Sequence, residues 1–194
     1  MTLRDWSALA VRGLLVVAMA AAIPGLSARH QDRIGCKGDS AIFLLEAQAV
    51  PSATQIPCFF PLPAGWRYGV SEVSSGSVMA RLDSDRAGDR AVELTLERTC
   101  DVSRASPVRL PHAPQGVLRY DEPTSLHPQS SISYFRFEGG CVTYRFSFTR
   151  NSAPLIYEQA DRFLGFTPRA KYVQSLRDEE GRTLCGAGAP PCPG

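Results

Sequence analysis

The chain has 194 residues, which suits one domain of ordinary size and leaves little for a second. Lysine and arginine number 21 against 19 acidic residues, so the net charge is only +2. That balance is too mild to favour nucleic acid or an acidic membrane surface as a partner. We therefore expect no nucleic-acid partner.

Residues 1–28 are predicted to be a targeting segment. Arg4 and Arg12 precede an uncharged apolar run at 13–23, and the small residues Gly25 and Ser27 suit a cleavage site after position 27. The run matches the length of a signal-peptide apolar region, about 7–15 residues. The alternative is an uncleaved anchor that crosses the membrane and holds the protein there. Either way, residues 29–38 form a tether, and residues 39–194 form a single domain that is extracytoplasmic, secreted or anchored to the cell membrane.

The cysteines are predicted to form disulfide bonds, because an even number behind an export signal is typical of a disulfide framework. The sequence places them at Cys36, Cys58, Cys100, Cys141, Cys185 and Cys192. We favour a Cys100–Cys141 bond, since each cysteine stands at the end of a predicted strand. If the side chains of both strands alternated strictly, the two cysteines would point to opposite faces of the sheet, which argues against this pairing. Cys36–Cys58 and Cys185–Cys192 would then be the other bonds.

The first half of the domain is predicted to be one helix followed by strands. Asp39-Ser40 offers an N-cap for a helix over 40–49, although a strand is possible in so short a run. Four prolines within 51–63 predict irregular structure there. Alternating side chains then predict a hairpin of 67–73 with 77–83 and a strand over 91–98, whose Val92, Leu94 and Leu96 face inward.

The second half continues the sheet and closes with helices. Residues 101–115 are expected to be a loop and 117–120 a weaker strand. Residues 132–137 and 142–148 form the clearest hairpin, because Gly139-Gly140 supplies the positive φ angles of a tight turn. A helix over 155–164 is expected to end at Gly165. A second helix is expected to start at Thr167-Pro168 and to end before Gly181.

The aromatic stretch YFRFEGGCVTYRFSF at 134–148 allows two interpretations. Val142, Tyr144, Phe146 and Phe148 share one side of a strand, whereas Arg145 points to the other side. This parity favours a core hairpin with buried rings over an exposed platform that stacks on a glycan. Strands in one block with helices at both ends predict an α+β fold. We expect an antiparallel sheet of about five to six strands with helices on one face.

The sequence contains no assembled catalytic, cofactor or metal motif. Its histidines, His30, His112 and His127, stand far apart in the tether and the loops. The aspartates at 83, 85 and 89 hint at calcium but lack the spacing of a calcium loop, so a solvated turn is expected. A glycosidase-like pair could lie among four acidic residues, which are otherwise ordinary surface carboxylates: Glu72, Glu93, Glu97 and Asp101.

Several segments carry a resemblance to a family of actinobacterial envelope proteins that are exported or membrane-anchored and have no assigned activity. These segments are LLEAQAVPSAT (44–54), PLPAGW (61–66), LDSDRAGDRAVELTL (82–96), GGCVTYRFSF (139–148), LGFTPR (164–169) and LCGAGAPPCPG (184–194). The resemblance spans most of the exported part and implies an exported or anchored domain, with no catalytic residue to transfer. PLPAGW leading into paired strands is also similar to the entry of small PsbP-like lipoprotein domains.

These observations predict an exported, non-enzymatic domain that binds a partner protein or an envelope component such as a glycan. Two alternatives are a hydrolase of an envelope polymer, acting through carboxylates, and an accessory subunit of a membrane complex. An uncleaved N-terminal segment would favour the second alternative. No cofactor is expected in any of these cases.

Overall fold

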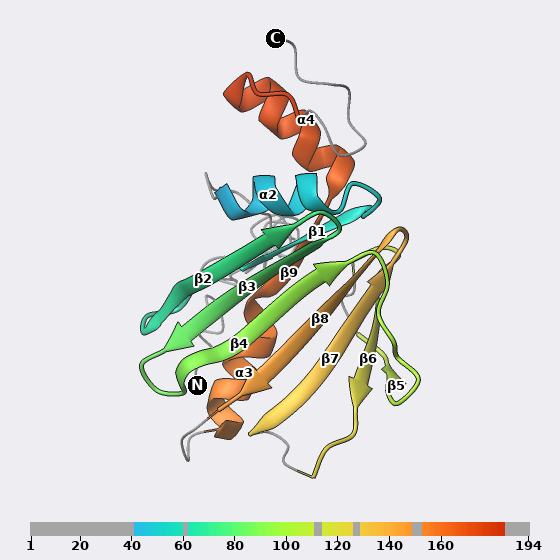
Figure 1. Cartoon of the computed structure of the whole chain (residues 1–194). Helices are drawn as coiled ribbons and strands as arrows, with labels where there is room; N and C mark the ends of the chain where they lie inside the picture. The colour runs from blue at the N-terminus through green and yellow to red at the C-terminus, as the bar shows by residue number, and fades with distance from the viewer. Residues whose placement is uncertain (1–40, 60–61, 111–113, 126–128, 149–152, 185–194) are drawn as a thin grey trace, which may run out of the picture. The chain divides into compact units, whose positions relative to one another are not determined.

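The computed structural model describes residues 41–59, 62–110, 114–125, 129–148 and 153–184, which all belong to one compact unit (Figure 1). The helices are α2 (Ala41–Ala49), α3 (Ala153–Phe163) and α4 (Arg169–Glu180). The strands are β1 (Gln55–Phe59), β2 (Trp66–Ser74), β3 (Ser77–Ser84), β4 (Gly88–Glu97), β5 (Ser106–Val108), β6 (Leu118–Glu122), β7 (Ser130–Phe137), β8 (Gly140–Ser147) and β9 (Leu164–Pro168). The predicted signal or anchor segment and tether lie outside the described residues.

Seven strands form one antiparallel sheet in the order β2-β3-β4-β8-β7-β6-β5, and β1 pairs with β9 in a separate two-stranded sheet (Figure 1). The predicted α+β class with a mainly antiparallel sheet is therefore confirmed. The large sheet has more strands than expected because β5 forms inside the segment predicted to be a loop. Within the part of the chain that the structure describes, no helix is long and apolar enough to cross a bilayer.

The predictions of α2 and of both hairpins are confirmed, but the predictions around β1 and at the end of α3 are wrong. The proline-rich segment 51–63 contains β1, in which Pro57 lies opposite Phe166. A strand with one partner directs half of its backbone groups away from the ladder, so a proline can be accommodated there. In addition, α3 runs directly into β9, and Gly165 lies in that strand opposite Cys58 instead of ending the helix.

The last helix, α4, begins later than predicted, and the prediction of its end is confirmed. Thr167 and Pro168 still belong to β9, so α4 begins at Arg169. Gly181 adopts the left-handed conformation with φ of 63° and donates its backbone N–H to the Leu176 carbonyl. This is the glycine C-cap that the sequence predicts.

One face of the large sheet, here called the inner face, carries the core. The predicted inward positions of β4 and β8 are fully buried, as Leu94, Tyr144 and Phe146 show. The rings of Tyr144 and Phe146 lie 4.6 Å apart in an edge-to-face arrangement, which aromatic pairs favour. Arg145 is exposed on the opposite, outer face. The core-hairpin interpretation of the aromatic stretch is thus confirmed.

The inner face is covered by α3 and by the two-stranded sheet. Tyr144 Oη donates to the Ala160 carbonyl of α3 at 2.9 Å, and the Phe59 ring of β1 lies 5.8 Å from the Tyr144 ring. The helices do not all share this position. Phe43 of α2 packs with Tyr172 and Leu176 of α4 in a second apolar cluster.

The turn of the β7–β8 hairpin is held against the segment that follows α2. Ser52 Oγ donates to the Gly139 carbonyl at 2.7 Å, and the Thr54 backbone N–H donates to the Glu138 carbonyl at 3.0 Å. Gly139 has φ of +69°, and a Cβ atom added there would overlap the Ser52 carbonyl oxygen. The glycine is needed for close approach as well as for the turn.

The Cys100–Cys141 disulfide is confirmed, with a Cα–Cα distance of 5.8 Å. The bond forms although strand alternation predicted that the two cysteines point to opposite faces, and the reason is the position of Cys100. Cys141 lies opposite Glu97, the last residue of β4, and Cys100 follows three residues later, where the strand alternation has ended. Cys58 is also disulfide-bonded. The predicted Cys36–Cys58 and Cys185–Cys192 pairings stay predictions, because Cys36, Cys185 and Cys192 lie outside the described residues.

Candidate functional site

The most prominent buried polar group is Arg119 of β6, whose side chain is 7% exposed on the inner face. Its guanidinium binds Asp121 at 2.7 Å and Asp161 of α3 at 2.9 Å. It also donates to Ser133 Oγ and Tyr157 Oη, each at 3.2 Å. This set is called the Arg119 cluster.

The Arg119 cluster holds α3 on the sheet and is poorly suited to catalysis. Burial alone would lower the pKa of Arg119, but the hydrogen bonds that its guanidinium donates to Asp121 and Asp161 raise this pKa above its usual range. Burial and then the Asp161 charge raise the pKa of Tyr157, so this phenol stays protonated at neutral pH. The guanidinium therefore keeps its proton, and its strongest donors are already committed to two carboxylates.

The four acidic residues considered as a glycosidase-like pair do not gather in a cleft. Glu72 and Glu93 lie on either side of Arg81 and pair with it at 3.1 and 3.2 Å. Glu97 lies at the end of β4. Asp101 is exposed and accepts the Ser103 backbone N–H at 2.8 Å, a bond that lowers the pKa of Asp101. Two of the four thus neutralise one arginine, and Asp101 caps a turn.

The aspartate-rich turn between β3 and β4 surrounds Arg67 of β2. Its carboxylates lie 3.6 Å (Asp83), 2.9 Å (Asp85) and 3.3 Å (Asp89) from the guanidinium. Arg67 thus occupies the place where a cation would sit, as expected for a solvated turn. Among the residues that the structure describes, no cluster of histidine, cysteine or acidic side chains could hold a metal ion. The three histidines lie outside these residues.

Exposed apolar side chains follow β2, an edge strand of the large sheet. Val70 is 67% exposed and Val73 is 44% exposed, whereas the aliphatic side chains of the neighbouring strands are buried. Tyr68 is also exposed, and its hydroxyl donates to the Phe59 carbonyl at 2.8 Å. Burial and then the nearby Glu46 raise the pKa of Tyr68 to about 12. We call β2 with its exposed side chains the β2 edge.

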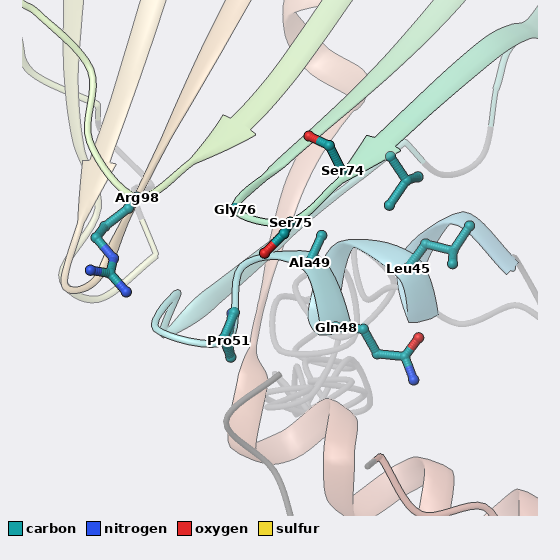
Figure 2. A pocket seen from close by; sticks show the side chains of 9 residues that line it. Leu45, Gln48, Ala49, Pro51, Ser74, Ser75, Gly76 and Arg98 are labelled. Atoms are coloured by element: carbon teal, nitrogen blue, oxygen red, sulfur yellow. The ribbon is translucent and has the colours of Figure 1, made fainter. Parts of the chain in front are cut away.

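A groove of about 480 Å³ lies where the β2 edge meets α2 (Figure 2). Leu45 of α2 lies at one end of it, and Arg98, just after β4, lies at the other end (Figure 2). Val73 of β2 also lines the groove. The Gly76 backbone N–H donates to the Ala49 carbonyl at 2.9 Å, which fixes the hairpin tip to the end of α2. The remaining lining residues are Gln48, Pro51, Ser74 and Ser75.

Arg98 is the charged residue of this groove. It is exposed, and it forms no ion pair with any carboxylate in the described ranges. An exposed guanidinium beside aliphatic side chains can bind a carboxylate that arrives with an apolar segment. The groove therefore combines an apolar part with one positive charge.

Glu46 of α2 is an unusual neighbour of this region. Its side chain is buried, and its Oε2 atom has no hydrogen-bond partner. Burial raises the pKa of Glu46 well above its usual range, so the folded protein favours the neutral acid. Because its charge also affects the pKa of Tyr68, Glu46 lies close enough to the β2 edge to influence it electrostatically.

No protein-family model, curated protein or solved structure matches the chain. The resemblance to actinobacterial envelope proteins therefore stays a prediction. Any functional assignment depends on the geometry of the β2 edge, the groove and the Arg119 cluster.

Sequence analysis did not find the β2 edge or the groove. A signal was present, because WRYGVSEVS (66–74) lacks the strict alternation of a half-buried strand and contains Gly69. The structure places a register shift between Tyr68 and Ser71. Position at the edge, however, depends on the spatial order of strands, which local pattern does not specify.

Proposed function

We propose that this chain is an exported, non-enzymatic domain of the cell envelope that binds a partner protein through the β2 edge. The observation that carries this proposal is the exposure of Val70 and Val73 on a nine-residue edge strand. An open strand edge offers unpaired backbone groups to an extended segment, and exposed aliphatic side chains add apolar area. The groove beside Leu45 would receive a side chain of that segment.

The contrast within the same hairpin supports binding as the reason for this exposure. β3 alternates between buried and half-buried residues, whereas β2 is exposed along almost its whole length after Trp66. Natural edge strands are usually short, charged or covered. β2 has charged residues and a register shift, as protected edges do, but its nine-residue length and its two exposed valines suit a surface that is covered by a partner.

Export is proposed from the N-terminal sequence and is supported by the Cys100–Cys141 disulfide. Such bonds persist in oxidising compartments outside the cytoplasm. The domain would be secreted after cleavage or anchored to the membrane by residues 1–28. We place it with the actinobacterial envelope proteins that it resembles. An accessory subunit of a membrane complex is a separate alternative, which an uncleaved N-terminal segment would favour.

Site-specific photo-cross-linking in the native envelope tests the proposal. A photoreactive residue at Val70 or Val73 should yield one discrete adduct with a partner protein, because both positions lie on the β2 edge. The matched control is Arg145, which is exposed on the outer face of the central strand β8. An adduct at 70 and 73 but not at 145 is the expected result.

Equal adducts at all three positions, or none at 70 and 73, would contradict the assignment. A conservative variant at position 70 tests whether a change there leaves the protein folded. Val70→Thr keeps the β-branched shape at an exposed site, so we expect the free energy of unfolding to change by less than about 0.5 kcal/mol. Urea denaturation of the purified protein measures this.

A further inference from the structure

The groove between α2 and the tip of the β2–β3 hairpin has a charged end and an apolar end. Figure 2 shows Arg98 at one end and Leu45 at the other, with Ala49, Pro51 and Ser75 between them. Leu45 is 38% exposed, so its side chain offers aliphatic surface to a ligand. A molecule that lies along the groove therefore meets a guanidinium at one end and aliphatic carbon at the other.

The apolar part of the groove is built before a ligand arrives. Val73 lies opposite the buried Val78, so its side chain is on the inner face of the sheet, where it lines the groove. The hydrogen bond from the Gly76 backbone N–H to the Ala49 carbonyl fixes the hairpin tip against the end of α2. Walls that are already in place lower the cost of binding.

Arg98 supplies the charge of the groove. Among the residues that the structure describes, no carboxylate lines it. Glu97, which precedes Arg98, lies opposite Cys141 in the sheet and is not part of the lining, and the buried Glu46 is not part of it either. An anionic group can therefore reach the guanidinium without repulsion from the walls, and a guanidinium binds a carboxylate through two parallel hydrogen bonds.

The size of the groove limits the kind of ligand. Its volume of about 480 Å³ lies within the range typical of small-molecule sites, roughly 300–1,000 Å³. This space admits one aliphatic chain with its head group and is too small for a lipid with two acyl chains.

We propose that the groove binds a free, single-chain aliphatic carboxylic acid. The carboxylate pairs with Arg98, and the chain lies past Ala49 toward Leu45 and Val73. This inference does not require the partner protein of the β2 edge. The ligand would fill the space beside Leu45 that a side chain of the partner would otherwise enter, so the two occupants exclude each other there.

Photolabelling of the purified full-length protein tests the site. A diazirine analogue of dodecanoic acid is irradiated with the protein, and mass spectrometry locates the labelled residues. The labels should fall within 45–51 and 73–76, because these segments line the groove. Unlabelled dodecanoate should suppress them at a roughly fivefold lower concentration than dodecanol, since one exposed ion pair contributes modestly.

A chain-length series tests the apolar part. Complete burial of one CH₂ group strengthens binding about fourfold, and a groove that is open on one side buries only part of each group. From octanoate to dodecanoate, each added CH₂ should therefore lower the suppressing concentration roughly twofold. Equal potency of all chain lengths would show that the aliphatic chain does not lie in the groove.

Three variants separate the head from the chain. Arg98→Gln should make dodecanoate and dodecanol equally effective, whereas Arg145→Gln, at an exposed arginine of the outer face, should preserve the difference. Leu45→Gln should weaken both ligands, because it removes apolar wall and leaves the charge. Circular dichroism should show that each variant melts at the temperature of the native protein.

Four results would overturn the proposal. Equal suppression by dodecanoate and dodecanol in the native protein would exclude Arg98 as the partner of the head. Labels confined to the apolar run at 13–23, or spread evenly over the domain, would exclude the groove. Stronger suppression by phosphatidylglycerol vesicles would replace the free acid with a bilayer lipid, and a concentration-dependent dimer that blocks labelling would replace it with a second copy.

The proposed function can fail or hold separately from this inference. Val70 is not part of the groove lining, so its cross-linking to a partner does not depend on whether an acid binds in the groove. A discrete adduct at Val70 without labels at 45–51 and 73–76 would leave the β2 edge as the binding surface and exclude the acid. Labels in the groove without an adduct at Val70 would give the reverse conclusion.

Discussion

The two hairpins of the large sheet differ in what lies against their turns. Gly76 of the β2–β3 hairpin and Gly139 of the β7–β8 hairpin both have positive φ, at +86° and +69°. No atom lies within 4 Å of a Cβ added to Gly76, whereas the same atom at Gly139 would overlap the Ser52 carbonyl oxygen. The two turns have similar backbone conformations but different surroundings. The Gly139 turn packs against Ser52, and the Gly76 turn borders the groove.

The two hairpins also differ in how deeply the side chains of their strands are buried. β8 lies between two neighbours at the centre of the sheet, and its inner side chains are fully buried. β2 lies at the edge, and its valines remain exposed. Apolar residues alone therefore do not define the core, because the position of a strand in the sheet decides which of them lose contact with water.

The largest effect is expected from removing the Arg119 charge, which ties β6 to α3. Arg119→Met leaves Asp121 and Asp161 without their cation, and breaking such a pair costs about 3–5 kcal/mol. Urea denaturation monitored by circular dichroism measures the change. A loss below about 1 kcal/mol would show that the cluster is not what holds α3 on the sheet.

The two turn glycines provide a direct comparison. Gly139→Ala should cost about 3–4 kcal/mol, because a strained φ is combined with overlap on a backbone atom. Gly76→Ala should cost only about 1 kcal/mol, from the φ alone. Thermal unfolding of the two variants in parallel checks the ranking, and similar melting temperatures would contradict the difference between the hairpins.

The next prediction concerns the Cys100–Cys141 disulfide, which joins the start of β8 to the segment after β4. Replacing both Cys100 and Cys141 with serine should cost about 2–4 kcal/mol, because the bond spans a separation of 41 residues in the unfolded chain. Denaturation with and without reductant measures the loss. If the double variant is as stable as the native protein, the remaining contacts at the end of β4 are sufficient.

The remaining prediction concerns Glu46 of α2 and depends on pH. The folded pKa of Glu46 is raised by burial, so the folded state binds the proton more tightly than the unfolded state. The stability contribution is complete at acidic pH and is lost as the pH rises above the usual glutamate pKa toward the folded value. Glu46→Gln should abolish this loss.

The expected result is therefore that Glu46→Gln and the native protein differ least near pH 4 and that the variant is the more stable one at pH 8. Urea denaturation at the two pH values measures this. The reverse order at pH 8 would mean that the Glu46 carboxylate is stabilised in the folded protein.

Much of the sheet could be predicted from sequence because its central strands bury one face. Val92, Leu94 and Leu96 alternate with polar residues, and that period determines both the strand and its inward side. The Cys100–Cys141 bond followed from placing β4 beside β8. These features depend on local pattern and on one strand pairing.

The incorrect and missing predictions depend on long-range contacts. Pro57 could join β1 because that strand has one partner, β9, which lies over 100 residues later in the chain. Gly165 looked like a helix end, yet pairing with Cys58 draws it into a strand. The β2 edge and its groove arise from the order of strands in the sheet and from the position of α2.

The direct passage from α3 to β9 has a consequence for proteolysis. Proteases need an extended, accessible segment, which loops supply and which paired strands and helices do not. Phe163 ends the helix and Leu164 already belongs to the strand, so no loop separates them. We expect this junction to resist nicking in the native protein, and a cut there would signal that β9 has come away from β1.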